Sequence, residues 1–478
     1  MRSKLTVLLL AAPATLLAQA GSANLPVAPQ PVPQRFSAAL SQQIAPNASA
    51  SQESPQQSKP LLDPQSPTTP ITRSDAEQLA LKNNPRITAN HLLALAAGQV
   101  TRQTRSGDLP QIYAAMTAEK AEDGSRIGAG ALTNSRLYTH AGTGGTLTQL
   151  ITDFGHTRDL VATNKLQEKA QDRTTVATQQ DVLMATDEAF FRLLNAQSLL
   201  GVAKATVAAR SNVRDLTSAL TKSALKSDLD LNIASADLSQ SQLLQLDAEN
   251  AVASASAALA AVLAAPPDTV YQAVEEPGTA PPPPGPGSSP VLNASAQAQR
   301  PDLQALHYNA QAYQKFARAQ QLQHLPTISA LAIGGISPVS PDNIFVPHWY
   351  AAAGVNLSIP LFTGFRIDAQ AEEARLRQRA TEKQAQDLSD SIARDVRVGV
   401  LNAQTAFRRI AVAEQFRDQT AQALALAQTR YKLGLSSIVE LSQAQLQSTQ
   451  ASVAAVNARY DYLLALRALD YARGQLAP

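Results

Sequence analysis

The chain has 478 residues, of which 44% are apolar but only 4% are aromatic, and its formal net charge is +2 at pH 7. The near-neutral charge gives no reason to expect nucleic-acid binding, and the low aromatic content argues against several thick globular cores. The absence of cysteine excludes thiol chemistry, disulfides and cysteine-bound metals. Abundant alanine, glutamine, leucine and serine instead favour long helices packed in thin layers.

Residues 1–23 have the features of a secretory signal peptide. Arg2 and Lys4 precede an apolar run that is too short to span a bilayer as a helix. Small residues follow the run, so cleavage is expected after Ala20 or Ala23. No later apolar run is long enough for a membrane helix, although the weaker signal of an outer-membrane β-barrel would escape this test.

A predicted disordered arm and then a first structured repeat follow the signal peptide. Residues 24–70 are rich in proline, glutamine, serine and alanine and are predicted to form a disordered arm. A first structured repeat is predicted over 71–265, and it opens with a helix whose capping box is Ser74-Asp-Ala-Glu77. Alternating residues then predict a β-hairpin over 108–152.

Two very long helices complete this first repeat. They are predicted over 156–222, which contains no proline, and over 227–265. The first would be about 100 Å long, and a helix of that length outside a membrane needs a coiled-coil partner. A proline- and glycine-rich linker follows over 266–290.

Residues 291–478 repeat the same order of elements. A second hairpin is predicted over 325–362, and two more long helices over 366–432 and 437–473. Both hairpins begin with Leu-Pro-x-Ile, and the helix break of the first repeat recurs 210 residues later in the second. A register that persists over so long a stretch indicates a duplicated strand-to-helix unit.

One stretch of the second hairpin, Gly354–Phe365, alternates apolar and small polar residues as a strand does. Its apolar residues are expected to face lipid, and they are Val355, Leu357, Ile359 and Leu361. Two hairpins give one chain four strands, which are too few to enclose a barrel and would leave two open edges. Open edges are not viable in a bilayer, so the sheet is expected to close by oligomerising, and three copies would supply twelve strands.

The sequence resembles the TolC-type outer-membrane efflux channel family over about residues 74–473. The resemblance rests on the duplication, the paired Leu-Pro-x-Ile starts and three motifs, which are LTQLITD at 147–153, LSIPLF at 357–362 and RYKLGLSSIVEL at 430–441. It implies an α+β membrane protein in which a trimeric, twelve-stranded β-barrel in the outer membrane continues as a periplasmic α-helical coiled-coil tunnel.

The resemblance also implies a task and partners. A homotrimer surrounded by outer-membrane lipid would be the exit duct of a tripartite efflux or type I secretion system. It would passively conduct substrates from an inner-membrane pump to the exterior, together with a periplasmic adaptor, a membrane fusion protein. The alternative is a secreted or periplasmic coiled-coil structural or adhesion protein without a channel, which predicts neither a barrel nor a requirement for detergent.

The two helix breaks would form the adaptor-docking tips, by the same resemblance. These tips comprise Leu225 and Lys226 in the first break and Gly434, Leu435 and Ser436 in the second. A plain helix-to-helix turn ending at a glycine is the alternative interpretation. The best-known members of the family carry an arginine where this chain has Ser436, so a closed state here is expected to use other bonds.

A periplasmic gate, again by resemblance, would comprise Asp230, Tyr431 and Glu440. Helix capping explains the two acids equally well. Glu440 forms a capping box with Ser437, and Asp230 is nearly in one with Ser227. Acids in a first helical turn also suit the helix dipole, so both interpretations stay open.

No catalytic, cofactor or metal site is predicted, and the chain is not expected to be an enzyme. The six histidines lack metal-ligand spacing, and the glycine-rich run at 142–145 lacks the Gly-Lys-Ser/Thr of a phosphate loop. The acidic pairs at 187–188 and 372–373 are on long helices, where solvated faces are expected.

Overall fold

The protein is described here from a computed structural model, which covers residues 69–120, 126–127, 135–136, 140–266, 268–275, 282, 289–337 and 348–476. The predicted signal peptide and nearly all of the predicted arm lie outside these residues, as does part of the predicted linker. Every element below belongs to one compact unit of the chain, Pro60–Pro478.

Among the described residues, four strands form one antiparallel sheet in the order β2-β5-β7-β8. Their bounds are β2 Gln111–Glu119, β5 His140–Thr152, β7 Thr327–Ser337 and β8 His348–Ser358. Each hairpin supplies two neighbouring strands, and the β5–β7 pair joins the two repeats. Strands β2 and β8 are therefore the two edges of the sheet.

The contact between the repeats depends on glycine at one point. Gly144 on β5 pairs with Gly335 on β7. A Cβ atom added to Gly335 would lie 2.5 Å from the carbonyl oxygen of Thr143 and 2.7 Å from the Cα of Gly144. Only glycine allows the two backbones to approach this closely.

Strand β8 is shorter than predicted. It ends at Ser358, so Ile359 and Leu361 follow the strand instead of belonging to it. Pro360 has no N–H group to donate to a strand ladder, which explains why pairing stops just before it. The side chains of Val355, Leu357, Ile359 and Leu361 are all exposed in the single chain.

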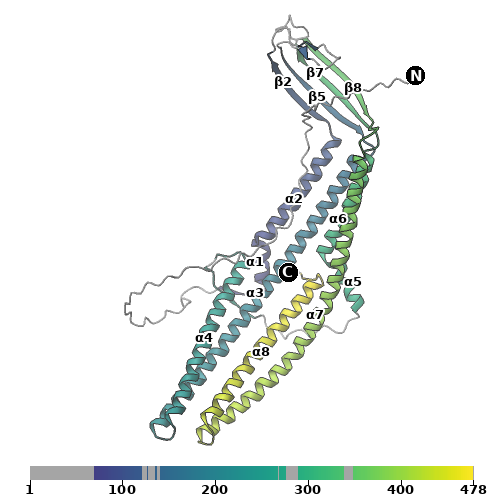
Figure 1. Cartoon of the computed structure of the whole chain (residues 1–478). Helices are drawn as coiled ribbons and strands as arrows, with labels where there is room; N and C mark the ends of the chain where they lie inside the picture. Colours follow the sequence, from purple (N-terminus) through teal and green to yellow (C-terminus); the bar gives the residue numbers. More distant parts are fainter. Residues whose placement is uncertain are drawn as a thin grey trace, which may run out of the picture. The chain divides into compact units, whose positions relative to one another are not determined.

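Each repeat contains one 67-residue helix and one 35-residue helix. They are α3 His156–Lys222 with α4 Asp228–Val262, and α7 Arg366–Lys432 with α8 Ile438–Ala472. The bounds of α3 and α7 coincide with the predicted ones. Helix α3 packs along α4, and α7 packs along α8, so each long helix has the antiparallel partner that its length requires. The sheet lies at one end of these helices and both helix turns lie at the other (Figure 1).

The part of the chain that the structure describes contains four shorter helices besides these. They are α1 Arg73–Asn83, α2 Pro85–Arg105, α5 Ser289–Gln299 and α6 Pro301–Leu322. Helix α2 packs on α3, whereas α6 lies between α3 and α7. The described residues also include a 3-10 turn at Ser106–Asp108 and two short strands, β3 Arg126–Ile127 and β4 Ser135–Arg136. Within the described part of the chain, no helix is long and apolar enough to cross a membrane.

The capping box that starts α1 differs from the predicted one. Thr72 is the N-cap, and its side chain and that of Asp75 bond each other's backbone N–H groups. Ser74 and Glu77 do not form the box, because the helix already includes Arg73. Glu77 is buried and is paired with arginines instead.

The predicted arm and linker also contain ordered strands. Strand β1 (Thr69–Ile71) lies at the end of the predicted arm, and β6 (Tyr271–Ala273) lies inside the predicted linker. The two strands pair in parallel. The largest apolar cluster lies beneath this pair. It contains Ile71, Phe190, Leu193, Leu259 and Tyr271, among others, and its residues come from β1, α1, α2, α3, α4, β6 and α8. Burial of these side chains explains why short strands form there at all.

Candidate functional site

The two helix turns, 223–227 between α3 and α4 and 433–437 between α7 and α8, have the same backbone structure. The N–H of Leu225 bonds the carbonyl of Leu220 at 2.9 Å, and the N–H of Leu435 bonds that of Arg430 at 2.8 Å. This bond is typical of a Schellman motif, in which the preceding residue is left-handed. That residue is Gly434 in the second turn, with φ 76°, but Ala224 in the first, with φ 57°.

Both turns present apolar side chains to solvent. The exposed fractions of Leu225 and Leu435 are 70% and 66%. Three more exposed apolar side chains extend this surface, and sequence reasoning did not single them out: Leu229, Leu433 and Val439. We call these five residues the tip surface. Exposed apolar groups gathered at one end of a molecule are typical of a protein-binding site.

Tyr431, a predicted gate residue, is completely buried near the end of α7. Its hydroxyl lies 3.0 Å from that of Thr217 on α3 and hydrogen-bonds it. The ring packs in a small apolar cluster with Ile438 and Leu441. Burial raises the pKa of Tyr431; the hydrogen bond to Thr217 acts against this rise, and the Asp230 carboxylate adds to it.

The two acids of the predicted gate have the local partners expected of helix caps. The complete capping box is formed by Asp230, however, and not by Glu440 as the sequence predicts. Asp230 and Ser227 form a complete capping box, with both bonds at 3.2 Å. Ser437 accepts the Glu440 N–H at 3.2 Å, but the Glu440 carboxylate lies 3.5 Å from Arg430 instead of closing the box. The sequence favoured the opposite assignment, because glutamate is the commoner third residue of a capping box.

Lys226 joins the two turns. Its ammonium group lies 4.5 Å from the centre of the Tyr431 ring and 3.5 Å from the carbonyl oxygen of Ser436, to which it donates a hydrogen bond. The structure thus brings Lys226, Tyr431 and Ser436 together, whereas Glu440 is held by Arg430. The roles of Lys226 and Thr217 depend on contacts between separate hairpins, and no local pattern in the sequence signals them.

A buried charge cluster far from the turns contradicts one sequence interpretation. Asp187 was assigned to a solvated face, but it is 0% exposed and bonds Arg467 of α8. Arg467 also bonds Glu77 of α1 at 2.9 Å. Burial raises the pKa of Glu77 to about 7; a hydrogen bond to Asp187 and the negative charge of Asp187 add to the rise, and two arginines oppose it.

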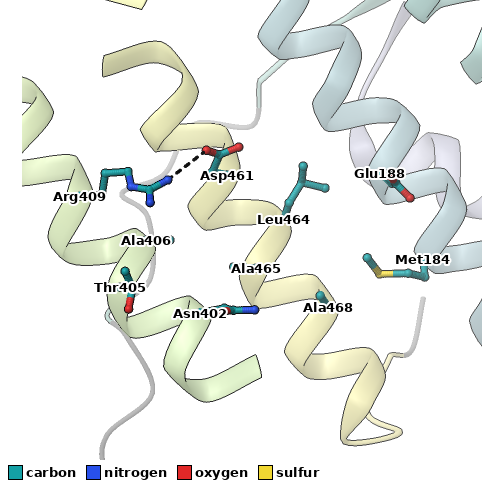
Figure 2. Close-up of a pocket in the computed structure, with 10 residues that line it drawn as sticks. All are labelled: Met184, Glu188, Asn402, Thr405, Ala406, Arg409, Asp461, Leu464, Ala465 and Ala468. Atoms are coloured by element: carbon teal, nitrogen blue, oxygen red, sulfur yellow. Dashed lines mark ion pairs between the residues drawn. The ribbon is translucent and has the colours of Figure 1, made fainter. Parts of the chain in front are cut away.

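A groove of about 500 Å³ runs between α7 and α8 and reaches α3 (Figure 2). Its lining residues are Met184, Glu188, Asn402, Thr405, Ala406, Arg409, Asp461, Leu464, Ala465 and Ala468. Arg409 and Asp461 face each other across it at 3.9 Å. Among the described residues, no group of three or more histidine, aspartate or glutamate side chains is placed to hold a metal ion. We assign no chemistry to this groove.

Comparisons with known proteins agree on one family. The model of the outer membrane efflux protein family matches residues 77–265 and 292–475, which include both turns. Outer membrane protein TolC of Vibrio cholerae is 23% identical over 416 residues, or 83% of this chain and 89% of that protein. TolC of Escherichia coli (strain K12) is 26% identical over 337 residues, or 66% of each chain.

Solved structures support the same fold. The outer membrane protein VceC from Vibrio cholerae has a TM-score of 0.72 to this chain at 20% identity, covering 84% of this chain and 96% of VceC. The family model alone accounts for more than half of the sequence. The chain therefore belongs to the outer membrane efflux protein family, has the fold of the TolC-type channels, and is a protein of the bacterial outer membrane.

Proposed function

We propose that this protein is the outer-membrane exit duct of a tripartite efflux or type I secretion system. In this role it passively conducts substrates that an inner-membrane pump delivers. One observation carries the proposal: a four-stranded sheet, whose two edges are unpaired among the described residues, continues into two 67-residue helices. Family membership favours this role over that of a coiled-coil structural or adhesion protein.

The open sheet edges support assembly into a homotrimer. Among the residues that the structure describes, β2 pairs only with β5 and β8 only with β7, so each edge strand has one side without a partner there. Both edges carry exposed apolar side chains, such as Met116 at 83% and Val355 at 69%. In a bilayer every backbone group needs a partner, and a ring in which β8 of one copy pairs with β2 of the next supplies it. Three copies give a twelve-stranded barrel, with the apolar residues around Val355 facing outer-membrane lipid.

The long helices support a tunnel in the periplasm. A 67-residue helix is about 100 Å long, several times the thickness of a bilayer. Helix α7 also carries apolar side chains that none of the described residues covers, and among them are Leu401, Val412 and Leu426. Packing against neighbouring copies would bury them and close the helical wall.

The tip surface is the proposed docking site for the periplasmic adaptor. Leu225 and Leu435 are two of its five exposed apolar side chains, and Lys226, Gly434 and Ser436 complete the two turns. Asp230, Tyr431 and Glu440 lie in the same region and are the proposed gate. Docking at this end would let an adaptor act on the gate directly.

Two measurements test this proposal, the mass of the purified protein in detergent and its ion conductance in a planar bilayer. The protein, extracted in detergent and purified, is expected to have the mass of a trimer and to produce discrete ion conductance in a planar bilayer. A monodisperse, water-soluble monomer that produces no conductance would overturn the proposal.

A further inference from the structure

We propose that Lys226 is a latch that holds the 433–437 turn against the 223–227 turn, so that the two hairpin tips of one chain move as a unit. Loss of this contact would allow the tips to separate. The inference rests on the proposed function in one respect, which is that tip separation would widen the periplasmic end of the duct.

The Lys226 ammonium contacts two groups of the other hairpin. Its ammonium group lies 4.5 Å from the centre of the Tyr431 ring, which belongs to α7. The same group donates a hydrogen bond to the Ser436 carbonyl, in the turn that follows α7. A cation held over an aromatic face is attracted by the electron density of the ring, and the carbonyl dipole adds to this attraction.

Two carboxylates near the turns, those of Asp230 and Glu440, have other partners. Asp230 is bonded to the cap of its own helix through Ser227. Glu440 lies beside Arg430, whose guanidinium also donates to the carbonyl of Leu435 at 3.4 Å. The ring and the carbonyl are the contacts of the Lys226 ammonium across the two turns, and both are lost when the turns separate.

The duplication of the chain explains why this latch is one-sided. Lys226 and Ser436 occupy equivalent positions in the two repeats, 210 residues apart. One repeat thus supplies the cation and the other supplies the acceptor. A serine side chain carries no charge, so the reverse arrangement cannot form in this sequence.

Several further side-chain bonds connect the two hairpins, and two of them lie nearest to the turns. They are the Thr217–Tyr431 bond at 3.0 Å and a bond of 2.6 Å from Ser442 to Asp237. Lys226 lies beyond both of them, in the turn itself. Its loss would leave these bonds in place and confine the separation to the last helical turns.

A distance measurement tests the latch without depending on conductance. The chain has no cysteine, so Leu225→Cys and Leu435→Cys accept spin labels specifically. Labelled chains are mixed with excess unlabelled chains, so that double electron–electron resonance reports the distance within one chain. With Lys226 present, a single short distance is expected. In Lys226→Met the population at longer distances is expected to rise about tenfold.

Two variants serve as controls: one keeps the positive charge at position 226, and the other removes a lysine at a nearby exposed position. Lys226→Arg retains a cation that can reach the ring and the carbonyl, and it is expected to keep the short distance. Lys432→Met removes an exposed lysine at the end of α7 and is expected to change nothing. If Lys226→Met gives the same distance distribution as the parent, or if Lys432→Met broadens it equally, the latch is overturned.

Conductance in a planar bilayer then separates the latch from the duct. Higher single-channel conductance in Lys226→Met than in Lys226→Arg supports both proposals. Separated tips with no conductance in any variant support the latch and count against the duct. Conductance that appears in every variant at one value, with unchanged distances, supports the duct and overturns the latch.

Discussion

Arg467 and Asp187 are 280 positions apart in the sequence, yet the Arg467 Nε lies 2.5 Å from the Asp187 Oδ2. This bond connects α8 of the second repeat to α3 of the first. Arg467 reaches Glu77 of α1 as well, so one guanidinium connects three helices. Asp187 and Glu77 are 0% and 3% exposed, so solvent cannot take the place of the arginine at either carboxyl group.

The first prediction is that Arg467→Met destabilises the protein strongly. Removing Arg467 leaves the buried Asp187 without its arginine, whereas Glu77 keeps Arg73. Loss of one partner of a buried ion pair costs about 3–5 kcal/mol. Denaturant unfolding of the purified protein measures the change. Arg408→Met, which removes an exposed arginine of α7, is expected to cost no more than about 0.5 kcal/mol. Equal losses in the two variants would show that the cluster contributes little.

The second prediction is a pH dependence caused by Glu77. Its pKa is raised from 4.5 to about 7 in the folded chain. A carboxyl group with a raised pKa contributes stability that is complete below the unfolded value and is lost as pH rises through the folded one. The free energy of unfolding is therefore expected to fall by about 3 kcal/mol between pH 4.5 and 7.5 relative to Glu77→Gln.

Unfolding midpoints across that pH range for the parent and for Glu77→Gln test this prediction. Glu373→Gln, on the exposed face of α7, is the matched control and is expected to follow the parent. Parallel pH profiles for the parent and Glu77→Gln would rule out Glu77 as the source.

The third prediction concerns the junction of the two repeats in the sheet. Gly335→Ala would place a Cβ atom within 2.5 Å of the Thr143 carbonyl oxygen, so β5 and β7 must move apart. Overpacking of this kind costs about 1–3 kcal/mol. We expect less folded protein, measured as the fraction that stays folded after heating in mild detergent. At Gly354 on β8 an added Cβ meets nothing within 4 Å, so Gly354→Ala should behave like the parent.

The fourth prediction tests docking at the tip surface. Leu435 is 66% exposed, and an aspartate there would place a charge in an apolar contact. Leu435→Asp is expected to reduce export at least tenfold while leaving membrane insertion intact, whereas Leu435→Met should export normally. Dye efflux by cells in which the variant is the sole outer-membrane duct measures this. Normal efflux by Leu435→Asp would remove Leu435 from the docking site.

Local patterns were enough to predict the helical part of the fold. The bounds of α3 and α7 follow from long stretches without proline and from the glycine-containing junctions before them, and both are local signals. The end of β8 was placed too late, because alternation continues past Ser358. Only Pro360, which cannot donate to the ladder, marks where pairing stops. Strands β1 and β6 were missed, because three residues carry too little periodicity to be detected.

The sequence by itself determined the duplicated order of strands and helices, the positions of the two turns and the family, because these depend on neighbouring residues and on a repeated register. Only the tertiary structure decided which side chains meet between the repeats. It shows that Asp187, for which the sequence predicts a solvated face, is a buried partner of Arg467, and that Lys226 lies against Tyr431 and Ser436. Contacts of this kind join residues more than 200 positions apart, and helical periodicity specifies a buried face without specifying what covers it.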